Sequence, residues 1–428
     1  MILQLVTLPV YLVVLLLSLL YYLVECTPTK FVPKMTTGDH LIVLCHGLNG
    51  DHRELLYLER TINEISDCKV LNSKKNDGGA YIVCFLVPFH IPSFLTHFLT
   101  AFPFLFASVK FGINQIEELS KKGIKTCAEE LAAEIREEVS SNPNLKKISM
   151  VGMSLGGLIS RYAAKLLYDA DRSTVAGLEP ETFMCIASPF LGVKSNTFLP
   201  LPRFMERMVG YIIGDTGLDL FLMDSRKELI YDMNTAEEYL QPLRAFKYRR
   251  LYAAIVNDFM VPLRTAAFVG DEEAEDIRAA FSDLRGIVGV IDGVFSQSEE
   301  KDAVSISTDC SMSIPHDSKS KMVQMRESLN SLGWSKVFVN FGGFLPLAHL
   351  QICANERWPS WVTSPMGVDA GQEVMIDGAR FLSQDKTGNS VTTYVDSSTC
   401  QVVKSKSNND LAVAAVNDRE IKIAAADS

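Results

Sequence analysis

The sequence lacks any concentration of basic residues. Its 428 residues include 41 Lys or Arg against 51 Asp or Glu, which gives a formal net charge of −10. Binding to the phosphates of a nucleic acid requires a concentrated basic surface. The sequence therefore argues against a nucleic-acid partner.

The sequence also lacks paired cysteines and glycosylation sites. Its nine cysteines form no C-x-x-C pair, and no asparagine lies in an N-x-S/T sequon. Cys45, Cys84 and Cys185 lie in apolar, strand-like stretches, so we expect buried thiols and neither a disulfide framework nor a zinc site. No metal or other cofactor is expected. The missing sequons favour a domain that never enters the secretory lumen.

Charged residues are missing from the first 24 positions, MILQLVTLPVYLVVLLLSLLYYLV. The part from Leu5 to Val24 is 20 residues long, which suffices for a helix to span a bilayer. No basic residue precedes it, as one would in a signal peptide, whereas Lys30 and Lys34 follow it. The sequence predicts an uncleaved anchor over 1–24 and a cytosolic domain, at the endoplasmic reticulum or a lipid droplet. A cleaved signal peptide and the secretory pathway are the alternative.

From residue 40 onwards, apolar stretches typical of strands alternate with helix-like stretches. We expect strands in 40–47, 79–87, 146–152, 181–189, 249–258 and 335–341, and helices in 51–65, 125–141 and 156–170. This alternation predicts an α/β fold, with a mostly parallel sheet covered by helices on both faces.

Three segments depart from this pattern within or after a folded domain expected over 38–383. Residues 85–109 contain seven of the 23 phenylalanines and no charged side chain, which predicts an insertion that docks onto a lipid surface, with burial in the core as the alternative. Residues 271–332 are charged and then serine-rich, which predicts a mobile insertion. Residues 384–428 predict a polar, disordered tail.

One serine lies between two glycines where an expected strand meets an expected helix. In KKISMVGMSLGGLISRYAAK, Gly152 and Gly156 flank Ser154 at a distance of two residues. Glycine and serine are common turn residues, so the pattern alone is weak. Its strand-to-helix context, however, is that of a nucleophile elbow, a tight turn that exposes a strained serine at a helix N-terminus. We therefore predict that Ser154 is a catalytic nucleophile.

A serine nucleophile requires a base, and the base requires an acid that orients it. In the α/β-hydrolase order, the acid and then the base follow the serine, each just beyond a strand. His316 and His349 are the histidines that follow Ser154. We favour His349, eight residues after an expected strand, over His316 in a polar stretch. Asp258 ends an apolar strand, where a carboxylate needs a partner, and is the predicted acid.

Acyl transfer also requires two N–H donors for the oxyanion of the tetrahedral intermediate. The backbone N–H of Leu155, directly after the nucleophile, is the first predicted donor. The second is expected in the loop HGLNG, where the N–H of Leu48 is best placed. We interpret His46 in this loop as a buried, hydrogen-bonded residue that shapes the loop.

Several blocks of the sequence resemble the eukaryotic putative serine esterase family, the α/β-hydrolase group that includes the yeast Rog-type lipases and a lipid-droplet phospholipase. The blocks are LIVLCHGLNGDHREL, KKGIKTCAEELAAEI, KKISMVGMSLGGLISRYAA, FMCIASPFLGV, TGLDLFLMD, FKYRRLYAAIVNDFMVPLRTAAF and AHLQI. The resemblance covers roughly 38–265 and 334–355. It implies an α/β-hydrolase fold, a triad of Ser154, Asp258 and His349, and hydrolysis of acyl esters in glycerolipids or phospholipids. Phe190 stands where the family usually has histidine.

We therefore expect a membrane-anchored serine lipase or esterase, whose partners are a lipid substrate and a membrane or lipid-droplet surface. An acyltransferase or thioesterase that uses the same triad is a second hypothesis. A non-catalytic membrane-bound α/β-hydrolase scaffold is a third, although a scaffold has no need of a complete set of catalytic residues.

Overall fold

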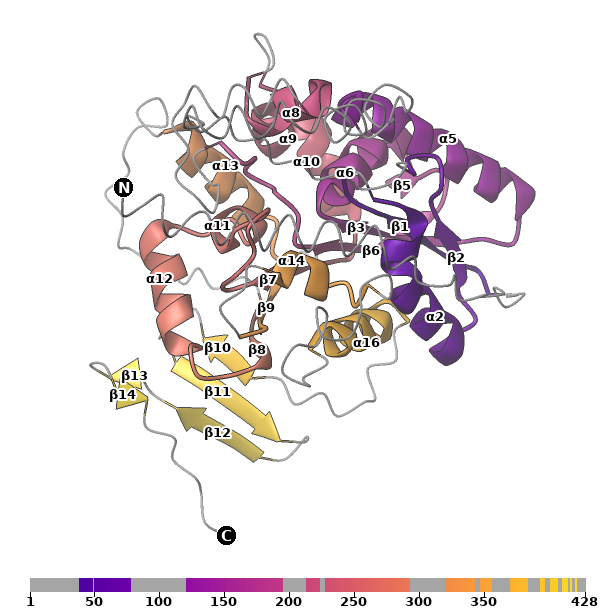
Figure 1. Cartoon of the computed structure of the whole chain (residues 1–428). Coiled ribbons are helices and arrows are strands. Elements are labelled where there is room, and N and C mark those ends of the chain that lie inside the picture. The colour runs from indigo at the N-terminus through magenta and orange to yellow at the C-terminus, as the bar shows by residue number, and fades with distance from the viewer. Residues whose placement is uncertain are drawn as a thin grey trace, which may run out of the picture.

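A twisted β-sheet runs through the centre of the protein in the computed structural model (Figure 1). The structure describes residues 38–48, 50–77, 121–194, 213–223, 228–292, 320–342, 347–355 and 370–383, and the backbone of short strands between 393 and 421. The order of the strands across the sheet is β12-β11-β10-β8-β9-β7-β6-β3-β1-β2. In chain order they are β1 (His40–Cys45), β2 (Lys69–Asn72), β3 (Lys147–Met153), β6 (Glu179–Ile186), β7 (Tyr248–Ala254), β8 (Gly286–Asp292), β9 (Ser335–Asn340), β10 (Thr393–Asp396), β11 (Gln401–Lys406) and β12 (Asp410–Ala414).

Neighbouring strands from β2 to β9 run parallel. Pairs β1–β2, β1–β3, β3–β6, β6–β7 and β7–β9 are all parallel, and β8 is antiparallel to β9. The predicted mostly parallel sheet is thus confirmed. As a consequence, the carboxyl ends of β1, β3, β7 and β9 lie at one edge, which is where open α/β sheets place their ligands.

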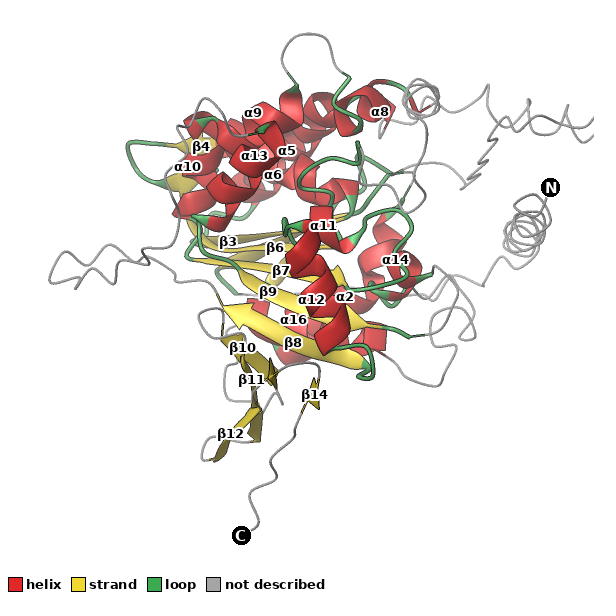
Figure 2. Ribbon diagram, turned by 90° about the vertical axis from the view of Figure 1, so that its left-hand side faces the viewer, coloured by secondary structure: helices red, strands yellow, loops and turns green. Residues whose placement is uncertain are grey.

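Helices cover both faces of the sheet, as the sequence predicts. One core cluster joins the sheet to α5, α6 and α8–α13, and a second joins the other face to α2, α14 and α16. Figure 2 shows α6, α9, α10 and α13 as a layer on the first face. The helices are η1 (His52–Leu55), α2 (Leu56–Ile65), α5 (Ile124–Ser141), α6 (Leu155–Leu167), α8 (Asp215–Leu220), α9 (Leu229–Thr235), α10 (Glu237–Ala245), α11 (Leu263–Ala266), α12 (Asp271–Ala280), α13 (Lys321–Asn330), α14 (Ala348–Gln351) and α16 (Ala370–Leu382). Two short pairings, β4 (Tyr168–Asp169) with β5 (Thr174–Val175) and β13 (Val416–Asn417) with β14 (Glu420–Ile421), lie outside the main sheet.

Local sequence explains the helix boundaries near the site. Asp51 caps η1, because its carboxylate accepts a hydrogen bond from the Arg53 N–H at 2.9 Å. In α5, apolar residues at helical spacing, among them Leu131 and Ile135, are fully buried. The N-terminus of α5 has no cap in its own sequence. Instead, Asp219 of α8 accepts a hydrogen bond from the Ile124 N–H at 2.9 Å.

The segment 271–332, predicted as a mobile insertion, contributes to the fold on both sides of the undescribed 293–319. It contains α12, β8 and α13, and β8 pairs with β9 in the main sheet. Ala274, Ile277 and Val288 in this segment are buried. The prediction was wrong for these parts, because a few small and apolar residues at helical or strand spacing are enough to anchor elements whose composition is otherwise polar.

The predicted disordered tail, 384–428, also contains regular structure. Strands β10, β11 and β12 extend the sheet beyond β8, with β11 antiparallel to both of its neighbours.

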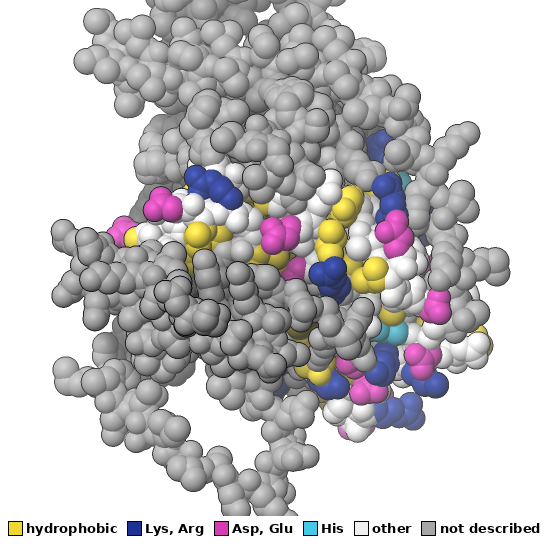
Figure 3. All heavy atoms as spheres, turned by 90° about the horizontal axis from the view of Figure 1, so that it is seen from below, with side chains coloured by type: hydrophobic (Ala, Val, Ile, Leu, Met, Phe, Trp, Pro, Cys, Tyr) yellow, Lys and Arg dark blue, Asp and Glu magenta, His cyan; other side chains and the backbone are white. Residues whose placement is uncertain are grey.

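Within the described residues, no helix is both long and apolar enough to cross a bilayer. The predicted anchor over 1–24, the strand expected at 79–87 and the phenylalanine-rich segment 85–109 all lie outside the described residues. The described cysteines Cys45 and Cys185 are free and buried, as predicted, and burial raises the pKa of Cys185 to about 12. On the face in Figure 3, the described acidic and basic side chains are interspersed and form no patch of one sign.

Candidate active site

Ser154 forms a strained turn between β3 and α6. Its backbone has φ +52° and ψ −126°, a conformation that residues other than glycine rarely adopt. Hydrogen bonds hold the turn: the Ser154 N–H donates to the Ile186 carbonyl at 2.8 Å, and the Gly157 N–H donates to the Ser154 carbonyl at 3.1 Å. The side chain is nearly buried at the carboxyl edge of the sheet. This is the elbow geometry that the sequence predicts.

Glycines at positions 47 and 156 allow the end of β1 to lie directly against the turn at Ser154 and the start of α6. A Cβ on Gly156 would lie 2.5 Å from the His46 carbonyl oxygen and would also collide with the Cys45 carbonyl. A Cβ on Gly47 would lie 2.9 Å from the Cβ of Ser154. The end of β1 therefore presses against both the serine and the start of α6, and side chains at these two positions would push them apart.

Asp258 and His349 form a buried pair at the same edge. Asp258 lies in the loop after β7 and His349 lies in α14, after β9. The Nδ1 of His349 is 2.9 Å from the Oδ2 of Asp258. The other carboxylate oxygen accepts from the N–H groups of Met260 at 3.0 Å and Val261 at 2.7 Å. Because Asp258 accepts the Nδ1–H, the neutral imidazole keeps a free lone pair on Nε2 and is oriented as a base.

Asn257 holds the two loops that carry this pair together. Its side-chain amide donates to the Gly342 carbonyl at 3.1 Å, and its own carbonyl accepts from the Ala348 N–H at 3.1 Å. An isolated bridge also pairs Asp258 with Leu347. Asn257 has φ +63°, which asparagine tolerates better than most residues. Sequence reasoning missed Asn257, and the available signal was an asparagine between an apolar strand and an acidic residue.

The electrostatic surroundings favour the charged form of His349. Burial on its own lowers the pKa of His349, but the charge of Asp258 and the hydrogen bond to it raise the pKa by more, and Glu54 adds to the increase. The net result is a pKa above the ordinary histidine value. The imidazolium that forms when the base accepts a proton is therefore stabilised.

The loop after β1 is held by three hydrogen bonds around Gly47. The Gly47 N–H donates to Glu54 Oε2 at 3.4 Å, and the Gly47 carbonyl faces His46 Nδ1 at 3.0 Å and accepts from the Gly50 N–H at 3.1 Å. Among the described residues, no backbone hydrogen bond uses the N–H of Leu48, the donor that the sequence predicts. Leu155, the other predicted donor, is the first residue of α6, where helix N–H groups lack partners within the helix.

The structure thus brings most of the predicted site residues to one edge of the sheet. Described contacts join His349 to Asp258 and place Gly47, next to Leu48, against Ser154. Among these contacts, no hydrogen bond joins the Ser154 hydroxyl directly to His349, and such bonds often tighten only when substrate binds. The alternative base, His316, lies outside the described residues. The buried carboxylate of Glu54 was not predicted, because its role depends on folding back against the β1 loop.

An elbow serine between a parallel strand and a helix, with an acid–base pair after later strands, defines an α/β fold of the serine-hydrolase type. Residues 108–271 match the model of the family described as putative serine esterase (DUF676). The resemblance predicted from the sequence is confirmed. Ser154 and Asp258 lie inside the matched range and His349 lies outside it.

Curated relatives share the same region. The chain is 33% identical over 154 residues to the putative lipase ROG1 of Saccharomyces cerevisiae, which covers 35% of this chain and 22% of that protein. It is 34% identical over 154 residues to the putative lipase YDL109C of the same yeast, with 35% and 23% covered. The putative lipase C4A8.10 of Schizosaccharomyces pombe is 32% identical over 136 residues, with 30% and 17% covered. The chain therefore spans less than a quarter of the length of these relatives.

Solved structures give weaker likenesses. Lipase B of Aspergillus fumigatus aligns with a TM-score of 0.31 and 11% identity, covering 58% of this chain and 44% of that one. The phospholipase PlaB of Legionella pneumophila aligns with a TM-score of 0.30 and 12% identity, covering 59% and 45%. The fold assignment rests on the sheet and the elbow and not on these alignments.

Proposed function

We propose that this protein is a serine lipase or esterase that hydrolyses acyl esters of glycerolipids or phospholipids through an acyl-enzyme. The observation that carries the proposal is the buried Asp258–His349 hydrogen bond at the edge where Ser154 forms its strained turn. A structural role alone does not require an ionisable pair of this kind beside a strained serine, since both features are costly to maintain.

In the proposed reaction, His349 Nε2 accepts the hydroxyl proton as Ser154 Oγ attacks the ester carbonyl carbon. The carbonyl oxygen becomes an oxyanion and accepts hydrogen bonds from the N–H groups of Leu48 and Leu155. When the tetrahedral intermediate collapses, the ester C–O bond breaks, and the imidazolium gives its proton to the leaving alcohol. Water then attacks the acyl-enzyme, with His349 again accepting the proton, and the fatty acid leaves as Ser154 is regenerated.

The lipid substrate class has separate support. The relatives that share this region are named as lipases, although the chain spans only a small part of their length. The apolar segments at 1–24 and 85–109 suit a chain that works at a membrane or lipid-droplet surface. We keep the anchored, cytosolic location as part of the proposal. An acyltransferase or thioesterase would use the same residues and differ only in the group that accepts or releases the acyl chain.

Hydrolysis of a short p-nitrophenyl ester and of an emulsified phospholipid tests the proposal. Replacing Ser154, His349 or Asp258 by alanine is expected to lower kcat by several orders of magnitude. The triple variant should be hardly worse than the serine variant, because triad residues act as a unit. Ser160→Ala, at another buried serine of α6, is the matched control and should retain activity. Full activity of Ser154→Ala would overturn the proposal, and loss of activity in His316→Ala but not His349→Ala would reassign the base.

A further inference from the structure

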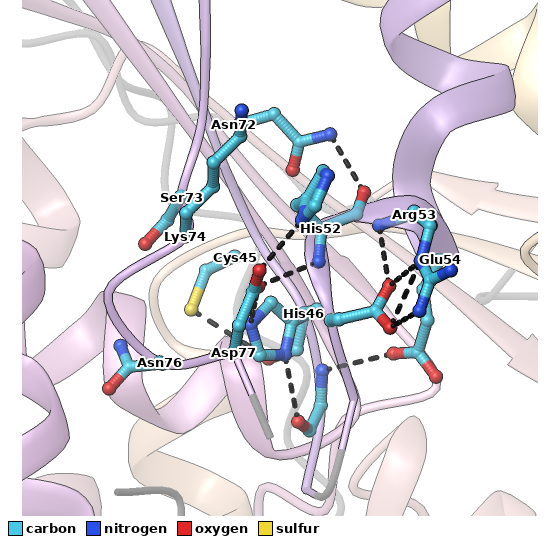
Figure 4. Close-up of polar contacts among 12 residues, drawn as sticks. Cys45, His46, His52, Arg53, Glu54, Asn72, Ser73, Lys74, Asn76 and Asp77 are labelled. Atoms are coloured by element: carbon cyan, nitrogen blue, oxygen red, sulfur yellow. Dashed lines mark hydrogen bonds and ion pairs between the residues drawn. The ribbon is translucent and has the colours of Figure 1, made fainter. Parts of the chain in front are cut away.

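Both ring nitrogens of the buried His46 lie close to oxygen atoms of other groups (Figure 4). Its Nδ1 is 3.0 Å from the Gly47 carbonyl oxygen, and its Nε2 is 3.1 Å from Asp77 Oδ1, an ion-pair contact without the alignment of a hydrogen bond. Neither a carbonyl nor an ionised carboxylate can donate a proton, and a lone pair on either nitrogen would be repelled at these distances. Neutral histidine carries only one N–H. The geometry therefore calls for the doubly protonated, positively charged ring.

The charges around His46 agree with this assignment. Asp77 follows β2 and is itself held in place by His52, whose backbone N–H donates at 2.8 Å and whose Nδ1 lies at 2.7 Å. Glu54 of η1, a second acidic residue, also acts on His46 and favours its charged form. The neighbouring cation, Arg53, is paired with Asp51 at 2.7 Å. The groups that face His46 from η1 and from the loop after β2 thus favour a cation.

The pKa directions are consistent with the geometry. Burial lowers the pKa of His46, but the contact with Asp77, the Glu54 charge and the Gly47 carbonyl together raise it above the ordinary value. Burial raises the pKa of Asp77, whereas the contact with His46 and the hydrogen bonds from His52 hold it well below its usual range. His40, at the other end of β1, shows the opposite behaviour. Burial and the nearby Lys147 lower the pKa of His40 to about 4 and outweigh the opposite effect of Asp39, and the His40 Nε2 lies 2.8 Å from the Ser149 hydroxyl.

We propose that His46 is a charged positioning residue, which holds and polarises the Gly47–Leu48 peptide so that the Leu48 N–H serves as an oxyanion donor. The inference rests on the proposed esterase function. In a trans peptide the C=O and the following N–H point in opposite directions, so a bond that holds the Gly47 carbonyl also sets the direction of the Leu48 N–H. A charged donor on the carbonyl withdraws electron density and strengthens that N–H as a donor.

Two substitutions separate the two contacts of His46. In His46→Asn, the side-chain amide nitrogen can replace Nδ1 and still donate to the Gly47 carbonyl, but without a charge and without Asp77. In His46→Gln, the amide nitrogen can replace Nε2 and face Asp77, while the Gly47 carbonyl loses its donor. Removing a whole oxyanion donor costs about 10²–10³ in kcat. Because Leu48 keeps its N–H here, we expect kcat to fall roughly tenfold in His46→Asn and more in His46→Gln, with KM nearly unchanged.

The pH profile adds a readout that a structural role would not change. If the charge on His46 assists catalysis, kcat/KM falls on the alkaline side as His46 loses its proton, at a pH above the ordinary histidine pKa of about 6.5. His46→Asn should lose this alkaline limb and keep the acid limb set by His349. His40→Gln is the matched control, because it removes a buried histidine at the start of β1, the strand that leads to His46, and should leave kcat and both limbs unchanged.

Nitrogen NMR of the protein with labelled histidines tests the charge without any need for activity. We expect the His46 ring, assigned by its loss in His46→Asn, to be doubly protonated at pH 7 while the His40 ring is neutral. A neutral His46 at pH 7, or an active wild type whose kcat and alkaline limb survive in both His46 variants, would overturn the inference alone. A folded wild type that neither hydrolyses esters nor reacts with a fluorophosphonate would overturn the proposed function, and the inference with it.

Discussion

The Nδ1 of His349 lies 2.9 Å from the Oδ2 of Asp258, although 91 residues separate the two in the chain. The distance follows from the pairing of β7 with β9 as parallel neighbours, because both strands then end at the same edge of the sheet. Asp258 lies in the loop after β7 and His349 lies in α14 after β9, and Asn257 ties these two segments together. The acid–base pair is therefore a direct product of the strand order.

Removing the charge of Asp258 should change both the rate and its pH dependence. We expect Asp258→Asn to lower kcat by about 10³–10⁴, because the imidazole loses its orienting acceptor and its stabilising charge. His349 must be neutral to accept a proton, so its raised pKa places the acid limb of kcat/KM above about 6.5 in the wild type. Without the carboxylate, burial dominates and the limb should move to lower pH. An acid limb that stays in place would show that another group sets it.

The left-handed backbone at Asn257 predicts how substitutions at this position change the stability of the protein. Glycine adopts φ +63° freely, so Asn257→Gly should lose mainly the hydrogen bond to Gly342, which is worth about 1 kcal/mol. Asn257→Ala loses the same bond and adds about 1–2 kcal/mol of backbone strain. In urea unfolding, the free energy of unfolding should therefore be highest for the wild type, lower for Asn257→Gly and lowest for Asn257→Ala. Equal stability of the two variants would contradict the strain at this position.

Close backbone approach at the elbow predicts that Gly156 tolerates no side chain. Gly156→Ala should lower the free energy of unfolding by about 1–3 kcal/mol and reduce activity, because its Cβ would force β1 away from α6. Gly378 of α16 is a matched control, since a Cβ there would meet its nearest atom, Met184 Sδ, at 3.4 Å. Gly378→Ala should be neutral or stabilise the protein by up to about 1 kcal/mol, as expected for alanine in a helix. If both variants have the same thermal stability, packing at the elbow is looser than the structure indicates.

Local patterns in the sequence predict the elbow and the main sheet, because a strand, a glycine-flanked serine and an amphipathic helix are encoded in consecutive residues. Chain order, together with the position of each residue after an expected strand, selected Asp258 and His349, which the structure joins. Asn257 and the His46–Asp77 contact could not be predicted, since each depends on loops brought together by tertiary folding. The elements α12, β8 and β10–β12 were missed because the insertion and the tail were predicted from average composition. Whether a helix or strand forms in such a segment depends instead on a few residues at regular spacing that can be buried.

The phenylalanine-rich segment 85–109 predicts a difference between two kinds of substrate. If it docks on lipid, replacing Phe98, Phe102 and Phe106 by serine should lower activity on emulsified lipid severalfold and spare a soluble short-chain ester, since less apolar area is buried at the surface. The measurement is the ratio of the two activities in the variant and in the wild type. Equal loss on both substrates would instead indicate that these side chains belong to the core.

The most direct test of the central claim is to map the residue modified by a fluorophosphonate probe. A serine activated by His349 and Asp258 attacks the phosphorus, displaces fluoride and keeps the probe in a covalent adduct. We predict one adduct per chain, located by peptide mass spectrometry at Ser154, which is absent from Ser154→Ala and strongly slowed in His349→Ala. A folded wild type that stays unlabelled, or an adduct on another residue that persists in Ser154→Ala, would contradict the account.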